Sequence, residues 1–226
     1  MRKINLYLLL KQRRLRRNKK SNQANQSLGW MARGMVAVTS IVLIVALFLI
    51  GFLVIRFTNK LPSIDVLPTL MNRENGELLQ PTRVIDRSGS LILYTYADEE
   101  SPRKFLSIDP QLPQHFSPQL IRTVVAALDP TFWSNPGYDL AQWNNPEPQT
   151  IAERLVSDLI LWEEPASLNR AIRMRLLAGE LVSRYGRSNV LEWYLNSAWF
   201  GHYAFGAEAA SQLYLGKSAE ELTLAE

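Results

Sequence analysis

Residues 194–226 read YLNSAWFGHYAFGAEAASQLYLGKSAEELTLAE, and this stretch decides the fold of the chain. It begins within a helix that we expect over residues 188–197. Near its other end, Ser218 and Glu221 are spaced as in a capping box, which predicts a last helix. The chain ends inside that helix, so we expect a C-terminally truncated domain. Glu208 should accept hydrogen bonds from buried donors, because an unpaired buried carboxylate is costly.

The sequence upstream is mostly helical in pattern, with one short hairpin. Residues 84–93 predict two short strands around a Ser-Gly turn. Ser117 is an N-cap followed by proline at the first helical position, and apolar residues then repeat on one helical face. Two more helices are expected, one over 149–162 and one from residue 167 to a stop at Gly186. The pattern therefore predicts a mainly α fold.

An apolar segment lies near the N-terminus. Residues 35–55, MVAVTSIVLIVALFLIGFLVI, include no charged side chain. A helix of that length spans roughly 30 Å, the thickness of the hydrocarbon core of a bilayer. A buried core helix is disfavoured because the segment has no polar face, and a cleaved signal peptide is disfavoured because no small-x-small cleavage pattern follows. We therefore expect an uncleaved transmembrane signal anchor.

Basic residues are concentrated before this segment. Residues 1–34 carry ten Lys or Arg and no acid, whereas the part beyond Arg56 carries 14 basic and 21 acidic residues. The positive-inside rule therefore places the N-terminus in the cytoplasm and the larger C-terminal part on the other side of the cell membrane. The high isoelectric point is a property of the tail, so nucleic acid is not an expected partner. The tail either contacts anionic lipid or is solvated and partly disordered.

These patterns divide the chain into four parts: a basic tail (1–34), a transmembrane helix (35–55), a juxtamembrane linker (56–81) that is rich in proline, and a folded domain (82–226). The chain has no cysteine and two histidines, which excludes disulfides and Cys-based zinc sites and disfavours a His-rich metal site. It also lacks a phosphate-cradling glycine loop and a Gly-x-Ser-x-Gly motif, so the corresponding nucleotide and hydrolase functions are disfavoured.

Residues 194–226 closely resemble the C-terminal motifs of glycosyltransferase family 51, the peptidoglycan glycosyltransferase domain of class A penicillin-binding proteins. The matching positions include Tyr194-Leu195-Asn196, Gly206-Ala207-Glu208 and Leu222-Thr223-Leu224-Ala225-Glu226. The resemblance covers roughly residues 80–226 and implies a lysozyme-like helical domain. Members of this family polymerise lipid II: a sugar hydroxyl attacks C1 of a glycan linked to undecaprenyl pyrophosphate. One glutamate is the general base, a second assists near the pyrophosphate, and a divalent metal often helps.

Both glutamate positions of that family are apolar in this chain. The first family motif aligns with residues 126–139, where Leu128 stands at the base position and Asn135 at the histidine position. The adjacent Asp129 is a weak substitute, because neighbouring helix residues point about 100° apart. The second glutamate aligns with Met174. We therefore expect no catalytic residue of the family to be intact.

The remaining polar positions are candidates for substrate binding. Thr150 is retained in the second family motif, although most polar positions there have changed. Arg170 and Arg173, in the third motif, share a helical face and either meet a phosphate or stay solvated. Asn196 completes the candidate set, with a structural role as its alternative. Only residues 140–146 separate the first two motifs, where the family usually has a longer mobile lobe near the membrane, so donor binding is in question.

Three functions are compatible with the sequence. The first is a catalytically degenerate domain in peptidoglycan biogenesis that binds lipid-linked precursor or a cell-wall partner. The second is an active transglycosylase that polymerises lipid II, and the third is a purely structural membrane-anchored module. No cofactor is evident, although the family often uses a divalent metal. The expected partners are the lipid bilayer and, under the first hypothesis, lipid II or cell-wall synthesis proteins.

Overall fold

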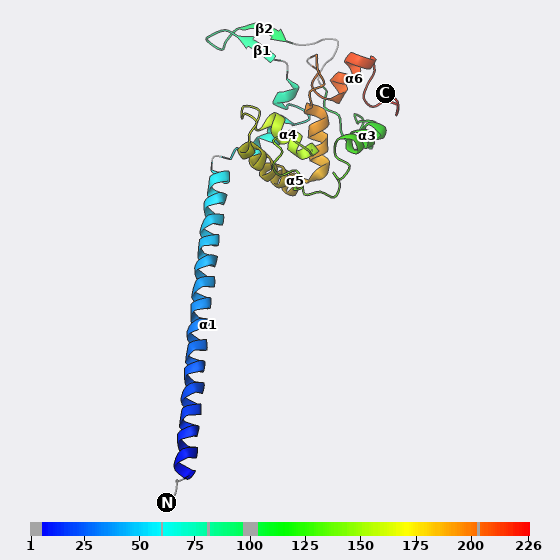
Figure 1. The fold of residues 1–226 in the computed structure, drawn as a ribbon. Helices are drawn as coiled ribbons and strands as arrows, with labels where there is room; N and C mark the ends of the chain where they lie inside the picture. The colour runs from blue at the N-terminus through cyan, green and yellow to red at the C-terminus, as the bar shows by residue number, and fades with distance from the viewer. Residues whose placement is uncertain (1–5, 60, 81, 97–103, 203) are drawn as a thin grey trace, which may run out of the picture. The chain divides into compact units, whose positions relative to one another are not determined.

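The computed structural model describes residues 6–59, 61–80, 82–96, 104–202 and 204–226. The chain forms two compact units, Met1–Asn59 and Lys60–Glu226. Helices make up most of the regular structure of the described residues (Figure 1). A two-stranded sheet in the second unit makes up the rest. The predicted mainly α fold with a short β-hairpin and one N-terminal apolar helix is therefore confirmed.

The described part of the first unit consists of one long helix, α1 (Leu6–Thr58). Its segment Arg33–Thr58 has a mean hydropathy of 3.1, and none of its most apolar stretch is buried by other parts of the structure. A 26-residue helix is longer than the roughly 20 residues that a bilayer requires. In the part of the chain that the structure describes, this is the one helix long and apolar enough to cross a membrane, which fits a single-pass membrane protein.

The second unit contains a hairpin of β1 (Thr82–Ile85) and β2 (Ile92–Tyr96), which pair antiparallel. Asp86 holds the turn, because its Oδ1 accepts hydrogen bonds from the backbone N–H groups of Ser90 and Leu91, each 3.0 Å away. The hydroxyl of Ser88 donates to the other carboxylate oxygen. These hydrogen bonds, the one from Ser88 foremost, lower the pKa of Asp86 to about 2. The two strands therefore lie on either side of the Ser-Gly turn, as the sequence predicted.

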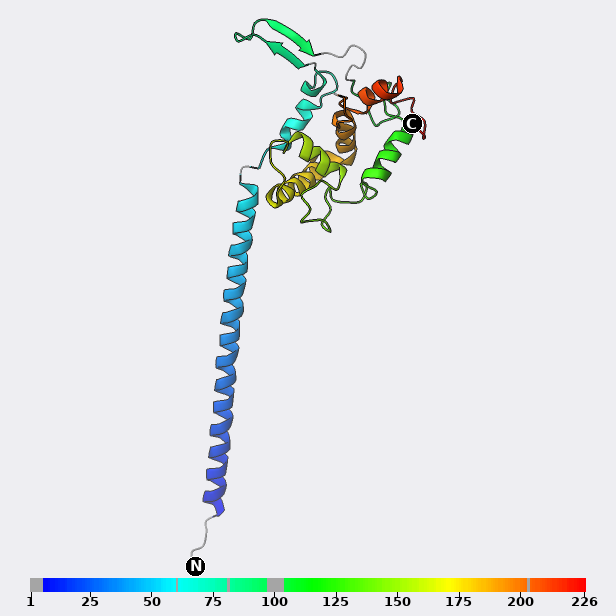
Figure 2. The same ribbon diagram turned by 45° about the horizontal axis from the view of Figure 1, so that its top comes forward.

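Among the described residues, the helical part of the second unit contains two short 3-10 helices and five α-helices, and Figure 2 shows how they are arranged. In chain order these are η1 (Ile64–Val66), α2 (Leu67–Leu70), η2 (Glu77–Leu79), α3 (Pro118–Leu128), α4 (Ile151–Leu159), α5 (Leu168–Ser197) and α6 (Ala207–Leu215). Ser117 caps α3 as predicted. Gly186 has a φ of 78° and interrupts α5, so α5 consists of the two consecutive helices that the sequence predicted.

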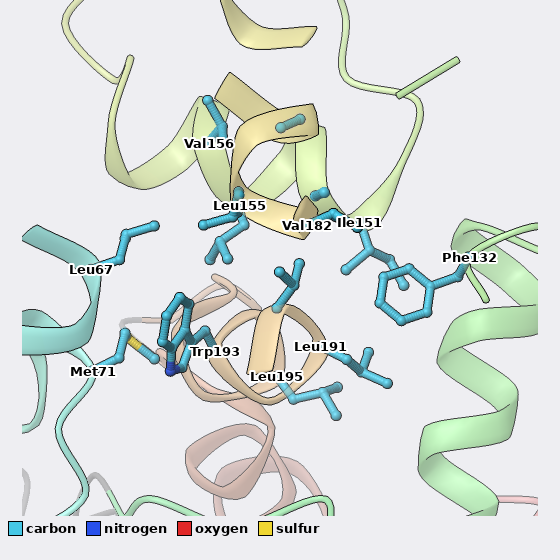
Figure 3. Packing of buried hydrophobic residues seen from close by; sticks show 14 of the residues in the cluster. Leu67, Met71, Phe132, Ile151, Leu155, Val156, Val182, Leu191, Trp193 and Leu195 are labelled. Carbon is cyan, nitrogen blue, oxygen red and sulfur yellow. The ribbon is translucent and has the colours of Figure 1, made fainter. Parts of the chain in front are cut away.

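The core lies where α4 packs against α5. Leu155 of α4 and Leu191 and Leu195 of α5 are each exposed by 1% or less, and the labelled apolar side chains of Figure 3 converge around them. Burial of a leucine side chain stabilises a fold by roughly 1.5–3 kcal/mol, so this contact supplies much of the hydrophobic stabilisation. Phe132, from the loop after α3, closes one side of the core.

Residues 61–80, within the stretch where we expected a juxtamembrane linker, fold into the second unit. Ile64, Leu67 and Met71 are exposed by 3% or less and belong to the same hydrophobic core. Pro68 stands in the first turn of α2, where a proline is tolerated, and the apolar residues around it belong to the core. Arg73 adds an ion pair to Glu192 of α5, with 3.0 Å between Nη2 and Oε1.

The predicted last helix is wrong, because residues 216–226 form turns and irregular structure. The Ser218 hydroxyl donates to Glu208 instead of capping a helix with Glu221. The expectation for Glu208 is confirmed, since this carboxylate is 3% exposed and also accepts hydrogen bonds from the Ala219 N–H at 2.7 Å and from Gln212. Glu208 therefore anchors the C-terminal segment to α6.

We predict that Gly206→Ala destabilises the domain by about 2–4 kcal/mol. Gly206 has a φ of 85°, and a Cβ atom at this position would lie 2.7 Å from the carbonyl oxygen of Asn196. The measurement is denaturant unfolding of the full chain in non-ionic detergent, followed by tryptophan fluorescence.

Gly89→Ala is the matched control. Gly89 has a similar φ of 75°, but an added Cβ would meet nothing within 4 Å. It should cost only the backbone strain, about 1 kcal/mol. If both variants lost the same free energy of unfolding, the close contact between residue 206 and Asn196 of α5 would not be the cause of the destabilisation.

Candidate functional site

A pocket of about 480 Å³ opens where the C-terminal end of α4 meets both halves of α5. Its polar lining comes from Ser157, Asp158, Arg170, Asn196 and Ser197. Its apolar lining comes from Leu78, Leu159, Trp162, Trp199 and Phe205. The volume lies within the range of roughly 300–1,000 Å³ that is typical of small-molecule sites. A concave surface that combines aromatic groups with charged groups makes this the candidate binding site.

Arg170 is held in the pocket wall by hydrogen bonds to α4 and the turn after it. Its Nη2 donates to the hydroxyl and the carbonyl oxygen of Ser157, at 2.8 and 3.3 Å, and its Nε donates to the carbonyl oxygen of Leu161 at 3.3 Å. Its Nη1 has no hydrogen-bond acceptor among the described residues. The guanidinium is therefore positioned by one side of its fork and available to a ligand on the other.

Asp158 is the carboxylate of the pocket. Burial raises its pKa above the ordinary value of 3.8, and the positive charges of Arg154 and Arg170 and a hydrogen bond from Ser157 act in the opposite direction. A perturbed carboxylate in a cleft is a candidate functional residue. The sequence interpretation missed Asp158, although its position four residues after Arg154 on the predicted helix placed both charges on one face.

Asn196 lines the pocket but its amide is occupied by the fold. Its Oδ1 accepts from the Leu106 N–H at 2.9 Å, and its Nδ2 donates to the carbonyl oxygens of Leu106 and Glu192 at 2.8 and 2.7 Å. One turn earlier, Glu192 accepts hydrogen bonds from the Ser107 hydroxyl and the Ile108 N–H. Asn196 and Glu192 together fix residues 106–108 against α5. The sequence interpretation did not identify Glu192.

The two positions at which the resemblance predicted missing catalytic glutamates are apolar packing positions. Leu128 is the last residue of α3 and packs against the core, and Met174 of α5 is completely buried. Asp129 is 3% exposed. Its carboxylate accepts hydrogen bonds from Thr131 at 3.1 Å, from the Asn135 amide at 2.9 and 3.0 Å, and from the Ile151 N–H at 3.3 Å. This carboxylate holds the loop after α3 against the start of α4.

The other two candidate residues lie away from the pocket lining. Thr150 is the N-cap of α4: its hydroxyl accepts from the Glu153 N–H and donates to the carbonyl oxygen of Gly137 at 2.7 Å. Arg173 forms an ion pair with Glu164 at 3.0 Å. Of the four candidate binding residues, the structure therefore brings only Arg170 and Asn196 together in one pocket.

A sequence profile of the family described as Transglycosylase matches residues 97–226, which is more than half of the chain. The chain belongs to the transglycosylase family. Three of its relatives are each called penicillin-binding protein 1A. That of Rickettsia prowazekii (strain Madrid E) is 34% identical over 160 residues, which cover 64% of this chain and 19% of the relative.

The second relative, from Aquifex aeolicus (strain VF5), is 30% identical over 201 residues, covering 79% of this chain and 26% of the relative. The third, from Haemophilus influenzae (strain ATCC 51907 / DSM 11121 / KW20 / Rd), is 31% identical over 163 residues, covering 67% of this chain and 18% of the relative. The chain thus spans a fifth to a quarter of the length of these relatives, and the similarity concerns the transglycosylase domain.

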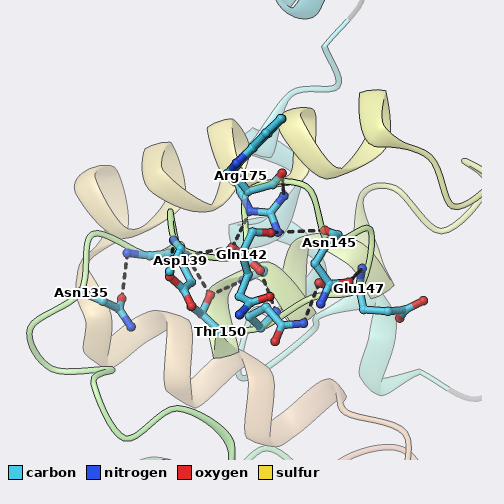
Figure 4. A network of polar contacts seen from close by, with 12 residues as sticks. Asn135, Asp139, Gln142, Asn145, Glu147, Thr150 and Arg175 are labelled. Carbon is cyan, nitrogen blue, oxygen red and sulfur yellow. Dashed lines mark hydrogen bonds and ion pairs between the residues drawn. The ribbon is translucent and has the colours of Figure 1, made fainter.

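In this transglycosylase domain, a buried ion pair ties down the short segment that follows the first motif. Arg175 of α5 lies with its Nε 3.3 Å from Oε1 of Glu153 on α4, and the two side chains are 7% and 0% exposed. Arg175 also donates to three carbonyl oxygens, those of Gln142, Trp143 and Asn145, at 2.8–2.9 Å (Figure 4).

Glu153 completes this network from the other helix. Its carboxylate accepts hydrogen bonds from the backbone N–H groups of Asp139 at 3.1 Å and Gln149 at 2.7 Å. Glu153 therefore binds both ends of residues 139–149, Arg175 binds their middle, and the two charges also bind each other. Residues 139–149 are thereby attached to both α4 and α5.

The divalent metal that the resemblance implies does not fit the donors of this transglycosylase pocket. Hard cations such as Mg²⁺ take oxygen ligands, usually one or two carboxylates. Asp158 is the one carboxylate among the lining residues, and the positive charges of Arg154 and Arg170 act on it. No group of three or more His, Asp or Glu side chains with metal-binding geometry occurs among the described residues.

We predict that Glu153→Leu destabilises the transglycosylase domain by about 3–5 kcal/mol, because it leaves the Arg175 charge buried without a counter-charge. Arg175→Met should cost a similar amount for the converse reason. The double variant Glu153→Leu/Arg175→Met should cost clearly less than the sum of the two single changes. Denaturant unfolding in detergent measures all three, and additive losses would contradict a coupled pair.

We also predict a pH-dependent effect of Asp158→Asn on stability. The folded-state pKa of Asp158 is raised, so its ionised form destabilises the fold at neutral pH, and this penalty is relieved as the pH falls through the folded pKa. The variant should therefore have the higher melting temperature near neutral pH. The difference should vanish below 3.8, the ordinary pKa at which Asp158 is protonated in both states. A variant that is less stable at neutral pH would contradict the direction of the shift.

Proposed function

We propose that this chain is a membrane-anchored transglycosylase-family domain that binds a lipid-linked peptidoglycan precursor in the pocket between α4 and α5 without polymerising it. The observation that carries the proposal is the complete burial of Met174 at the second glutamate position of the family. A substrate has no access to that position. Leu128, at the general-base position, also has no proton-accepting group.

The pocket supplies what binding requires. The free side of the Arg170 guanidinium suits a phosphate oxygen, because hydrogen bonds between a guanidinium and a phosphate are charge-assisted. A pyrophosphate-linked sugar is the ligand that family membership suggests for such a site. The basic tail and the apolar helix Arg33–Thr58 support an orientation with the tail in the cytoplasm and the pocket outside it, where such a precursor is polymerised.

An active transglycosylase is the second candidate, and Asp158 is the observation that favours it. A carboxylate with a raised pKa is better matched to general-base chemistry near neutral pH than an ordinary aspartate. Asp129 is a poorer candidate, since its oxygens already accept hydrogen bonds from three groups of the fold.

The test uses the purified full chain in detergent with fluorescent lipid II and a divalent metal. We expect binding with no polymer on a gel. Arg170→Ala should weaken binding about tenfold, which corresponds to roughly 1.4 kcal/mol. Arg122→Ala, which removes a solvent-exposed arginine of α3 outside the pocket, is the control and should bind as the wild type does.

Two outcomes would overturn the proposal. Polymer made by the wild type and abolished in Asp158→Asn would make the chain an active enzyme. Absence of binding at high micromolar lipid II would leave a structural membrane-anchored module. Thermal unfolding of each variant shows whether a loss of binding reflects a loss of fold.

A further inference from the structure

Two tryptophans at the pocket are largely exposed. Trp162 and Trp199 are 69% and 68% exposed, and both line the cavity that contains Asp158 and Arg170. Isolated exposed apolar side chains are common on protein surfaces. Two exposed indole rings at one pocket need a reason. Each exposes a large apolar face beside charged groups that suit a polar ligand, so the pocket matches a ligand with both kinds of surface.

Main-chain contacts fix the backbone at both tryptophans. Trp162 follows the buried Leu161 in a turn that is closed by a hydrogen bond from the Glu164 N–H to the Leu161 carbonyl oxygen at 3.0 Å. Trp199 lies two residues after the end of α5 and forms an isolated antiparallel bridge with Phe205. These contacts place both indole rings at the pocket without burying them. A ligand that stacks against the rings therefore has to order their side-chain torsions but not the backbone that carries them.

A pyranose ring matches this combination of groups. One face of a sugar ring carries C–H groups with partial positive charge, which are attracted to the negative π-face of an indole. Its edge carries hydroxyl groups, which can donate to the Asp158 carboxylate and accept from Nη1 of Arg170. A polyprenyl chain would use only the apolar part of the pocket, and a phosphate would use only the cationic part.

We propose that Trp162 and Trp199 are the sugar-stacking residues of this pocket and give it specificity for glycan-bearing over bare polyprenyl pyrophosphate ligands. This inference rests on the proposed function, because it names the residues that recognise the saccharide of the same ligand. Direct insertion of the two rings into a bilayer is less compatible with their setting, since an aspartate and an arginine within the same pocket would be brought toward lipid.

The experiment compares three probes on the full chain in detergent. Lipid II carries lipid, pyrophosphate and saccharide, undecaprenyl pyrophosphate lacks the saccharide, and soluble N-acetylglucosaminyl-N-acetylmuramic acid lacks the lipid and pyrophosphate. The wild type should bind lipid II at least about tenfold more tightly than undecaprenyl pyrophosphate, a difference typical of one well-formed contact. It should also bind the disaccharide weakly.

The variants separate the role of the rings from that of the fold. Trp162→Ala and Trp199→Ala should each lose about tenfold in affinity for lipid II and abolish disaccharide binding, with affinity for undecaprenyl pyrophosphate unchanged. Trp199→Phe keeps an aromatic face and should recover most of the affinity. Trp133→Ala is the matched control, because Trp133 is 53% exposed but lies outside the pocket lining, and it should bind every probe as the wild type does.

Each remaining outcome has a distinct meaning. Equal losses of affinity for lipid II and undecaprenyl pyrophosphate would show that the rings contact the lipid and would overturn the inference. Unchanged binding of lipid II in both alanine variants would overturn it as well, while leaving the proposed function in place. A wild type that binds the disaccharide but not lipid II would contradict the proposed function and preserve the sugar-stacking role.

Discussion

The ion pair between Glu153 and Arg175 lies inside the contact between α4 and α5, on which the rest of the domain depends. α4 and α5 supply most of the core, one wall of the pocket each, and the charged side chains that hold residues 139–149. Two charges that are almost completely buried are tolerated because each is also hydrogen-bonded to backbone groups of the loop. The pair thus links core packing to the shape of the surface above it.

Local signals in the sequence predicted several elements correctly. Ser117, with proline after it, marked the start of α3, Gly186 marked the break in α5, and the Ser88-Gly89 turn marked the hairpin. The role of Glu208 was also predictable, because a carboxylate between alanines on a buried helix face needs donors. In each case the determining interaction spans only a few residues or follows from burial alone.

Features that depend on contacts between distant segments were not predictable. Asp158 and the two tryptophans lie in one pocket because α4, α5 and the loop after α5 meet there, and no spacing within the sequence reports this. Residues 61–80 have the proline content of a linker, yet Ile64, Leu67 and Met71 find a hydrophobic surface to cover. The Ser218 hydroxyl binds Glu208, so a tertiary contact replaced the helix cap that the local pattern indicated.

The glycine that interrupts α5 also sets a dimension of the pocket. Arg170 belongs to the half of α5 before Gly186, and Asn196 and Ser197 belong to the half after it. A Cβ atom added at Gly186 would meet no atom within 4 Å. Glycine is therefore favoured here by its positive φ and not by a lack of room for a side chain. The distance between the pocket residues of the two halves therefore depends on the backbone torsions of Gly186, which lies 16 positions after Arg170 and 10 before Asn196. The direction that the chain takes at Gly186 sets the position of Asn196 relative to Arg170, and with it the size of a ligand that can contact both.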